Sequence, residues 1–167
     1  AAVAATYKKS IGGIWSYFME PIGDFGKAYD FRAAVALVGL GANTNEVAIY
    51  PRADYDSDKE ALNGANSYTL HFSSLPPVNE GGFWSITAYG DDDYLIDHPI
   101  NRYNVTDRSR YNLNADGTLD VTLSAADPQD GSFWLPTGNK GFHLFMRLYQ
   151  PDLKALDSWT PPTITKK

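Results

Sequence analysis

Histidine, tyrosine and arginine occur in three segments of the chain that alternate between apolar and polar or aromatic residues. This alternation is the spacing of one face of a β-strand. In each segment the residues between them are largely apolar, as in the run from Gly141 to Tyr149. If the three strands share a sheet, one face collects His71, Tyr89, His143, Arg147 and Tyr149. An arginine on such a face can hold a carboxylate in a bidentate fork, and a tyrosine or histidine can move a proton. A concave face of this kind suits a small molecule or a sugar.

The same pattern has a plainer interpretation. Polar outer faces are normal in antiparallel sheets, so these side chains could simply be solvated. Under that interpretation Arg147 forms a structural ion pair away from any cavity. Secondary binding candidates are Arg102, Asp97 and His98.

The acidic clusters do not match a metal site. The segment from Asp54 to Asp58 resembles the start of a calcium loop, but Lys59 and Ala65 stand where an EF-hand requires glycine and glutamate. The run from Asp91 to Asp93, with Asp97 nearby, could hold a hard cation, but we expect it to be a solvated turn. The three histidines are not at zinc-ligand spacing. We therefore expect no metal and no cofactor.

Composition excludes several classes of function. The chain has 167 residues, no cysteine and a formal net charge of −6. The lack of cysteine excludes thiol catalysis, Cys-ligated zinc and disulfides. The acidic charge argues against nucleic acid and anionic membranes as partners. The longest apolar run, Ala33 to Ala42, is half the about 20 residues that a membrane-spanning helix needs. Ala1 to Ala5 lacks the basic region of an intact signal peptide, and is either a remnant of cleavage or an arbitrary boundary.

The chain divides into a helical lead-in and a β region. Within residues 1–42 we expect helices at Val3 to Met19 and at Asp30 to Leu40. From Val47 onward short runs alternate between apolar and polar residues. The expected strands or extended segments are residues 47–52, 67–73, 82–89, 94–105, 111–113, 118–124, 132–135 and 141–149, followed by an extended surface tail over 159–167. This pattern predicts a mostly β fold, an antiparallel jelly-roll-like β-sandwich over residues 43–167, in a single domain of residues 1–167.

Several motifs, taken together and in order, resemble those of one family. They include Ala48-Ile49-Tyr50-Pro51, Leu75-Pro76-Pro77-Val78, Phe83-Trp84-Ser85-Ile86-Thr87, Pro99-Ile100-Asn101-Arg102-Tyr103 and Arg147-Leu148-Tyr149-Gln150-Pro151. From about Gly23 to Pro162 the chain is similar to domain-of-unknown-function family 1214. The resemblance implies a jelly-roll-like β domain in exported or envelope-associated proteins, hence a periplasmic or secreted location. In many bacterial proteins this domain follows one of family 1254, so a partner N-terminal domain or a homo-oligomer is expected.

The resemblance brings no settled reaction and no catalytic residues. The chain also departs from the family pattern at His98, at Phe133 and at Thr137-Gly138, so any site in those loops would have its own chemistry.

Three functions fit these observations. The first is a ligand-binding or accessory domain for a carbohydrate or a small carboxylated molecule, with a shallow site on the sheet face. The second is a hydrolase or lyase, which requires a deep pocket and a histidine within hydrogen-bond reach of a carboxylate or tyrosine. The third is a structural or assembly domain, which predicts an exposed apolar patch.

Overall fold

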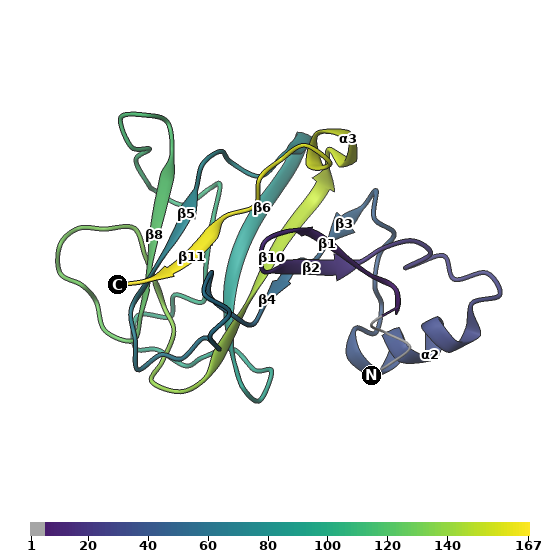
Figure 1. Ribbon diagram of the computed structural model, residues 1–167, viewed down its shortest axis with the longest axis horizontal. Helices are drawn as coiled ribbons and strands as arrows, with labels where there is room; N and C mark the ends of the chain where they lie inside the picture. The colour runs from purple at the N-terminus through teal and green to yellow at the C-terminus, as the bar shows by residue number, and fades with distance from the viewer. Residues whose placement is uncertain (1–5) are drawn as a thin grey trace.

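The structure, a computed structural model, describes residues 6–167 and consists mainly of β-strands in two sheets (Figure 1). The seven-stranded sheet has the order β1-β2-β4-β10-β6-β7, and β3 also pairs with β10. Its strands are β1 (Lys8–Gly12), β2 (Trp15–Phe18), β3 (Ala48–Ile49), β4 (Arg52–Ala53), β6 (Val78–Gly90), β7 (Asn104–Thr106) and β10 (Phe142–Pro151). The four-stranded sheet has the order β11-β5-β8-β9. Its strands are β5 (Tyr68–Phe72), β8 (Leu119–Ser124), β9 (Trp134–Pro136) and β11 (Thr163–Lys166).

The longest ladder joins β6 to β10. The two strands run antiparallel, with Phe142 opposite Gly90 and Tyr149 opposite Phe83. Because side chains alternate across a sheet, one face of the ladder is apolar and the other carries polar and aromatic groups. The apolar face supplies fully buried core residues, among them Leu144, Met146, Leu148 and Ile86.

The four-stranded sheet packs its apolar residues into the same core. Leu70 of β5 and Val121 of β8 belong to one continuous cluster with the buried residues of β6 and β10. The strand pairs are antiparallel except for β8 and β9, which are parallel. The predicted mostly β fold with antiparallel sheets is therefore confirmed, with this one parallel pair added.

The N-terminal segment differs from the prediction. Instead of a helix reaching Met19, strands β1 and β2 form an antiparallel hairpin. Gly12 and Gly13, which interrupt the predicted helix, have φ values of 119° and 55° and make the turn. Trp15 and Tyr17 alternate into the core, which is strand periodicity rather than helix periodicity. Ala1 to Ala5, including the start of the predicted helix, lie outside the described residues.

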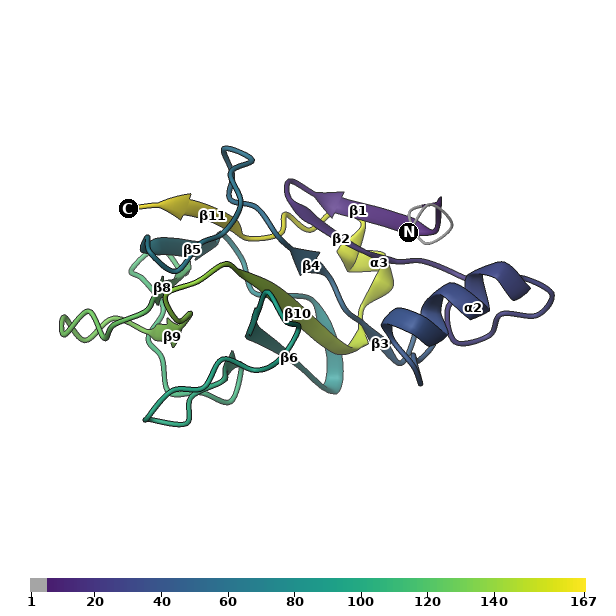
Figure 2. The same ribbon diagram turned by 90° about the horizontal axis from the view of Figure 1, so that it is seen from below.

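The second predicted helix is present. Helix α2 (Tyr29–Val38) lies at one end of the molecule in both views (Figures 1 and 2). Its buried residues Phe31 and Val35 pack with Ile22 in a small cluster separate from the main core. Leu37 and Leu40, at and beyond its end, are exposed. Within residues 6–167 no helix has the length and apolar character needed to cross a membrane.

The C-terminal segment is extended, as predicted, but it is not confined to the surface. After the short helix α3 (Leu153–Leu156), strand β11 pairs with β5 and buries Ile164 completely. The indole Nε1 of Trp15 donates a 2.7 Å hydrogen bond to the carbonyl oxygen of Pro162. The first hairpin and the last strand of the fold are thereby held together.

One close approach of two loops gives a test of this packing. A Cβ atom on Gly64 would overlap the carbonyl oxygen of Gly138. We expect Gly64→Ala to lower the free energy of unfolding by about 2 to 3 kcal/mol, the usual cost of overpacking a rigid site. Urea denaturation measures the change. Gly39→Ala is the matched control, because its Cβ would lie 3.9 Å from the nearest atom, the carbonyl oxygen of Val35. Equal stability of the two variants would contradict the close approach.

Candidate functional site

The polar face of the β6–β10 ladder brings together four of the five predicted site residues. Tyr89, His143, Arg147 and Tyr149 all lie on this face, opposite the core. Between them stand Thr87 and Phe145, which are cross-strand partners. We call this face the Arg147 platform.

Arg147 has no carboxylate partner within residues 6–167. Its Nη1 donates to Thr87 Oγ1 at 3.0 Å and its Nη2 donates to the Tyr89 hydroxyl at 2.7 Å. The guanidinium carbon lies 5.5 Å from the centre of the Tyr89 ring and 5.6 Å from that of Phe145. The structural ion pair offered by the plainer interpretation is therefore not formed. The half-buried cation is instead held by two neutral hydroxyls and two aromatic rings.

Two of the five N–H groups of Arg147 are occupied by these hydroxyls. The remaining donors have no hydrogen-bond acceptor within the part of the chain that the structure describes. A guanidinium fixed in this way loses little freedom when it binds an anion, because its orientation is already set.

Aromatic side chains flank the guanidinium. The rings of Phe83 and Tyr149 stack with centroids 4.6 Å apart, and Tyr50 meets Tyr149 edge-on at 6.2 Å. Burial, followed by its hydrogen bond with Tyr50, raises the pKa of Tyr149. Tyr149 therefore stays protonated at neutral pH and offers a hydroxyl rather than a phenolate.

His143 is the buried member of the platform, with 4% of its surface exposed. Its ring stacks on Tyr89 at 5.7 Å. Nε2 lies 3.3 Å from Asp93 Oδ1, but the geometry is not that of a hydrogen bond, and the buried nitrogen has no hydrogen-bond partner. Burial, and then the positive charge of Arg52, lowers the pKa of His143 against the opposing effect of Asp93. The histidine is therefore neutral at pH 7, despite its proximity to a carboxylate.

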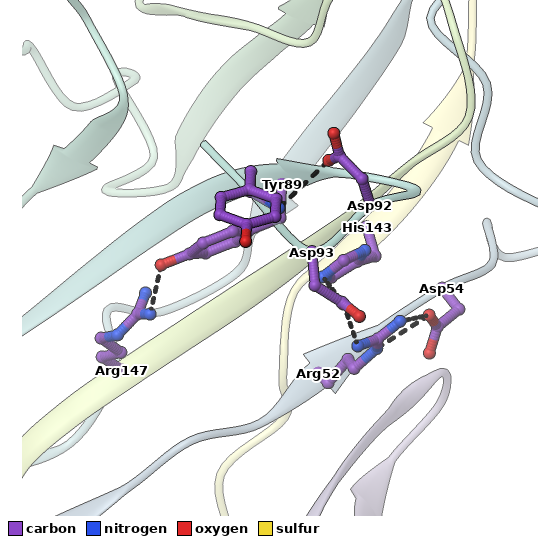
Figure 3. Close-up of polar contacts among 8 residues, drawn as sticks. Arg52, Asp54, Tyr89, Asp92, Asp93, His143 and Arg147 are labelled. Atoms are coloured by element: carbon purple, nitrogen blue, oxygen red, sulfur yellow. Dashed lines mark hydrogen bonds and ion pairs between the residues drawn. The ribbon is translucent and has the colours of Figure 1, made fainter. Parts of the chain in front are cut away.

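Asp93 connects His143 to a second arginine (Figure 3). Arg52 on β4 contacts Asp93 Oδ1 at 3.2 Å through Nη1 and Asp54 Oδ1 at 2.7 Å through Nη2. Arg52 thus has two carboxylate partners, whereas Arg147 has none. Neither Arg52 nor its role beside the platform was predicted, because nothing local to Arg52 indicates that β4 pairs with β10.

His71 is not part of the platform, so the predicted set of five is wrong in this respect. Strand β5 belongs to the four-stranded sheet, where it pairs with β8 and β11. His71 Nδ1 is hydrogen-bonded to Asp120 Oδ1 at 2.7 Å on the outer face of that sheet. Alternation correctly placed His71 opposite the core but could not show to which sheet its strand belongs.

The secondary candidates gather elsewhere. Arg102 donates to the carbonyl oxygen of Trp134 at 3.0 Å and lies over the Trp134 ring. His98 contacts the same ring edge-on at 5.4 Å. Asp97 is exposed. Two of these three side chains therefore pack on Trp134 rather than on Arg147.

Two surface clefts formed by the described residues lie away from the platform, and Arg147 lines neither of them. One, of about 440 Å³, lies between the first hairpin and residues 159–163. The other, of about 690 Å³, lies beside β7 and β8 and includes Arg102. The platform thus lies outside both of these clefts. Within residues 6–167 no three His, Asp or Glu side chains are placed to hold a metal ion.

The β6–β10 ladder and its polar face fall within the region matched by a family model. The model is that of "Protein of unknown function (DUF1214)", and it matches residues 47–153. The chain belongs to the DUF1214 family. The four platform residues Tyr89, His143, Arg147 and Tyr149 are all inside this DUF1214 region.

Solved structures share the fold of this DUF1214 chain. The VPA0106 protein from Vibrio parahaemolyticus is 29% identical, with a TM-score of 0.70 over 83% of this chain and 35% of its own. An uncharacterized protein from Burkholderia cenocepacia is 16% identical, with a TM-score of 0.50 over 72% of this chain and 29% of its own. The chain thus spans about a third of the length of each. No curated protein matches its sequence.

The depressed pKa of His143 makes the stability of this DUF1214 chain depend on pH. Above 6.5, the ordinary pKa of histidine, both folded and unfolded states hold the ring neutral. As the pH falls below 6.5 the unfolded state takes up a proton that the folded state still refuses, so the free energy of unfolding decreases. The decrease is about 1.4 kcal/mol per pH unit, until the pH reaches the folded-state pKa.

We expect the wild type to lose more stability between pH 7.5 and pH 5 than His143→Phe, which keeps a ring against Tyr89 but cannot titrate. Urea denaturation at the two pH values measures the difference. An NMR titration of the His143 ring in the folded wild type gives the pKa directly. A value at or above 6.5 would show that burial does not control this group.

Proposed function

We propose that this DUF1214 domain binds a small carboxylated molecule on the Arg147 platform. The observation that carries the proposal is an oriented, half-buried guanidinium that lacks a carboxylate of its own. A ligand carboxylate would accept charge-assisted hydrogen bonds from the free N–H groups of the fork.

The surroundings of Arg147 support a partly apolar ligand. Phe83, Tyr149, Tyr89 and Phe145 present aromatic surface on the same face, and the exposed Arg108 lies over the Phe83 ring at 4.8 Å. Aromatic rings contribute contact area, whereas the arginine fixes the orientation of the ligand. The chain is acidic overall, so free anions are drawn to it only where local positive charge outweighs the rest.

Binding fits this face better than catalysis. Arg147 lines neither of the two clefts described above, whereas the hydrolase or lyase hypothesis requires a deep pocket at the site. Nε2 of His143 lies against Asp93 and away from solvent, and Tyr149 is kept protonated. A general base at this face would need a pKa near neutral pH, so that it could both accept and release a proton.

We also propose the finer features that the family resemblance implies. The two sheets form a jelly-roll-like sandwich, which is supported by the single core cluster to which both contribute. The domain works outside the cytoplasm, which is supported by the family resemblance. It is one part of a longer protein, which is supported by the family resemblance and by the greater length of the two solved structures. A partner domain or a second copy has a possible contact surface in the exposed Leu37 and Leu40.

Two carboxylates and one neutral alcohol test the platform. We expect benzoate and succinate to bind the chain and benzyl alcohol not to bind, with affinities measured by isothermal titration calorimetry. Arg147→Gln should weaken binding of the carboxylates by about 10- to 100-fold, because a hydrogen bond to a charged group contributes about 1.5 to 3 kcal/mol. Arg147→Lys should recover only part of the loss, since a point charge cannot form the fork.

Arg32→Gln is the matched control, because it removes the same charge from the exposed side of α2. If Arg147→Gln binds benzoate and succinate as well as Arg32→Gln does, the platform is not the binding site. Amide NMR spectra of each variant check that the fold is intact.

A further inference from the structure

The cleft of about 690 Å³ beside β7 and β8 has a composition unlike that of the Arg147 platform. It is lined by two arginines, Arg102 and Arg110, by the rings of Tyr111 and Phe133, and by side-chain amides and hydroxyls from the loops around β7, β8 and β9. Its volume lies within the range of about 300 to 1,000 Å³ that is usual for small-ligand sites.

The two arginines carry positive charge that no carboxylate within residues 6–167 neutralises. Arg102 is fixed by its bond to the Trp134 carbonyl oxygen and by its position over the Trp134 ring, 5.8 Å from the centroid. Arg110 is exposed, and its side chain has neither a hydrogen bond nor an ion pair in the described part of the chain. One cation is thus held in place and the other is free to close on a ligand.

The acidic side chain of the lining does not cancel these charges. Asp120 is already occupied, because Oδ1 lies 2.7 Å from His71 Nδ1 and Oδ2 accepts from Asn114 Nδ2 at 3.1 Å. These two bonds direct its oxygens toward its neighbours on the protein. An anion entering the cleft therefore meets two guanidinium groups and a carboxylate whose acceptor positions are partly occupied.

The rings of the cleft offer an apolar contact surface. The centroids of Tyr111 and Phe133 lie 5.2 Å apart, and both rings pack against the main core. Burial, and then the negative charge of Asp107, raises the pKa of Tyr111, so its hydroxyl remains protonated. Tyr111 thus contributes a ring face and a hydrogen-bond donor, and it is unsuited to act as a base.

We propose that this cleft binds a sugar that carries a carboxylate, that is, a uronic acid or a short chain of them. The arginines receive the carboxylate, the amides and hydroxyls exchange hydrogen bonds with the sugar hydroxyls, and the rings receive its C–H face. This site is separate from the Arg147 platform, since Arg147 does not line the cleft.

Titration with digalacturonate, followed by amide NMR, tests the proposal on the whole chain. We expect shift changes to concentrate at residues 109–114 and 131–133. Galactobiose, a disaccharide of the same sugar ring without the carboxylates, should bind at least about tenfold more weakly than digalacturonate. Inorganic phosphate is the second comparison, because a guanidinium fork also accepts phosphate.

Arg110→Gln should weaken digalacturonate binding by about tenfold or more, whereas Arg32→Gln should leave it unchanged. The control removes the same charge from the exposed side of α2, outside both the cleft and the platform. Both substitutions exchange exposed side chains, so loss of folding is not the expected cause of any difference.

Four outcomes would overturn the proposal. Equal binding of galactobiose and digalacturonate would show that the cleft does not recognise the carboxylate. Phosphate binding as tight as that of digalacturonate would reduce the site to a general anion site. Shift changes confined to residues around Arg147, or no binding at all, would show that the cleft is not used. Shift changes confined to residues around Arg147 would leave the platform proposal intact.

Discussion

Strict alternation of side chains along one antiparallel ladder governs both the stability and the chemistry of this molecule. Strands β6 and β10 are paired so that Leu144, Met146 and Ile86 fill the core while Thr87 and Arg147 stand on the opposite face. A slip of one residue in either strand would exchange the two faces and bury a charged guanidinium. The core therefore fixes the register, and the register in turn places the hydroxyls that orient Arg147.

The sequence predicted what depends on local alternation. The β10 run and the helix near residues 30–40 are both found, because each follows the periodicity of its own residues. His71 was misplaced because sheet membership is decided by pairing between distant segments, here β5 with β8 and β11. The first hairpin was missed because residues 3–19 were interpreted as an interrupted helix. The Gly12-Gly13 pair followed by alternating Trp15 and Tyr17 is typical instead of two strands and a turn.

Arginines of the same ladder region have different environments. Arg52 lies between Asp54 and Asp93, whereas Arg147 contacts hydroxyls and rings. A salt-bridged arginine has its charge satisfied within the fold, whereas an arginine held by neutral groups keeps its field directed outward. Asp54 is close to Arg52 in the sequence, but Asp93 comes from a turn 41 residues downstream and Thr87 lies 60 residues before Arg147. These distant partners are what the sequence alone does not reveal.

The bond from Trp15 to Pro162 links segments that are synthesised at very different times. Strand β5 is paired on one edge by β11, and the first hairpin lies against the residues just before β11. Until residues 161–166 have left the ribosome, the hairpin has no partner for its tryptophan and β5 has an open edge. Most close residue pairs of the fold are far apart in the sequence, so we expect these segments to reach their final packing only after the last of them has been made.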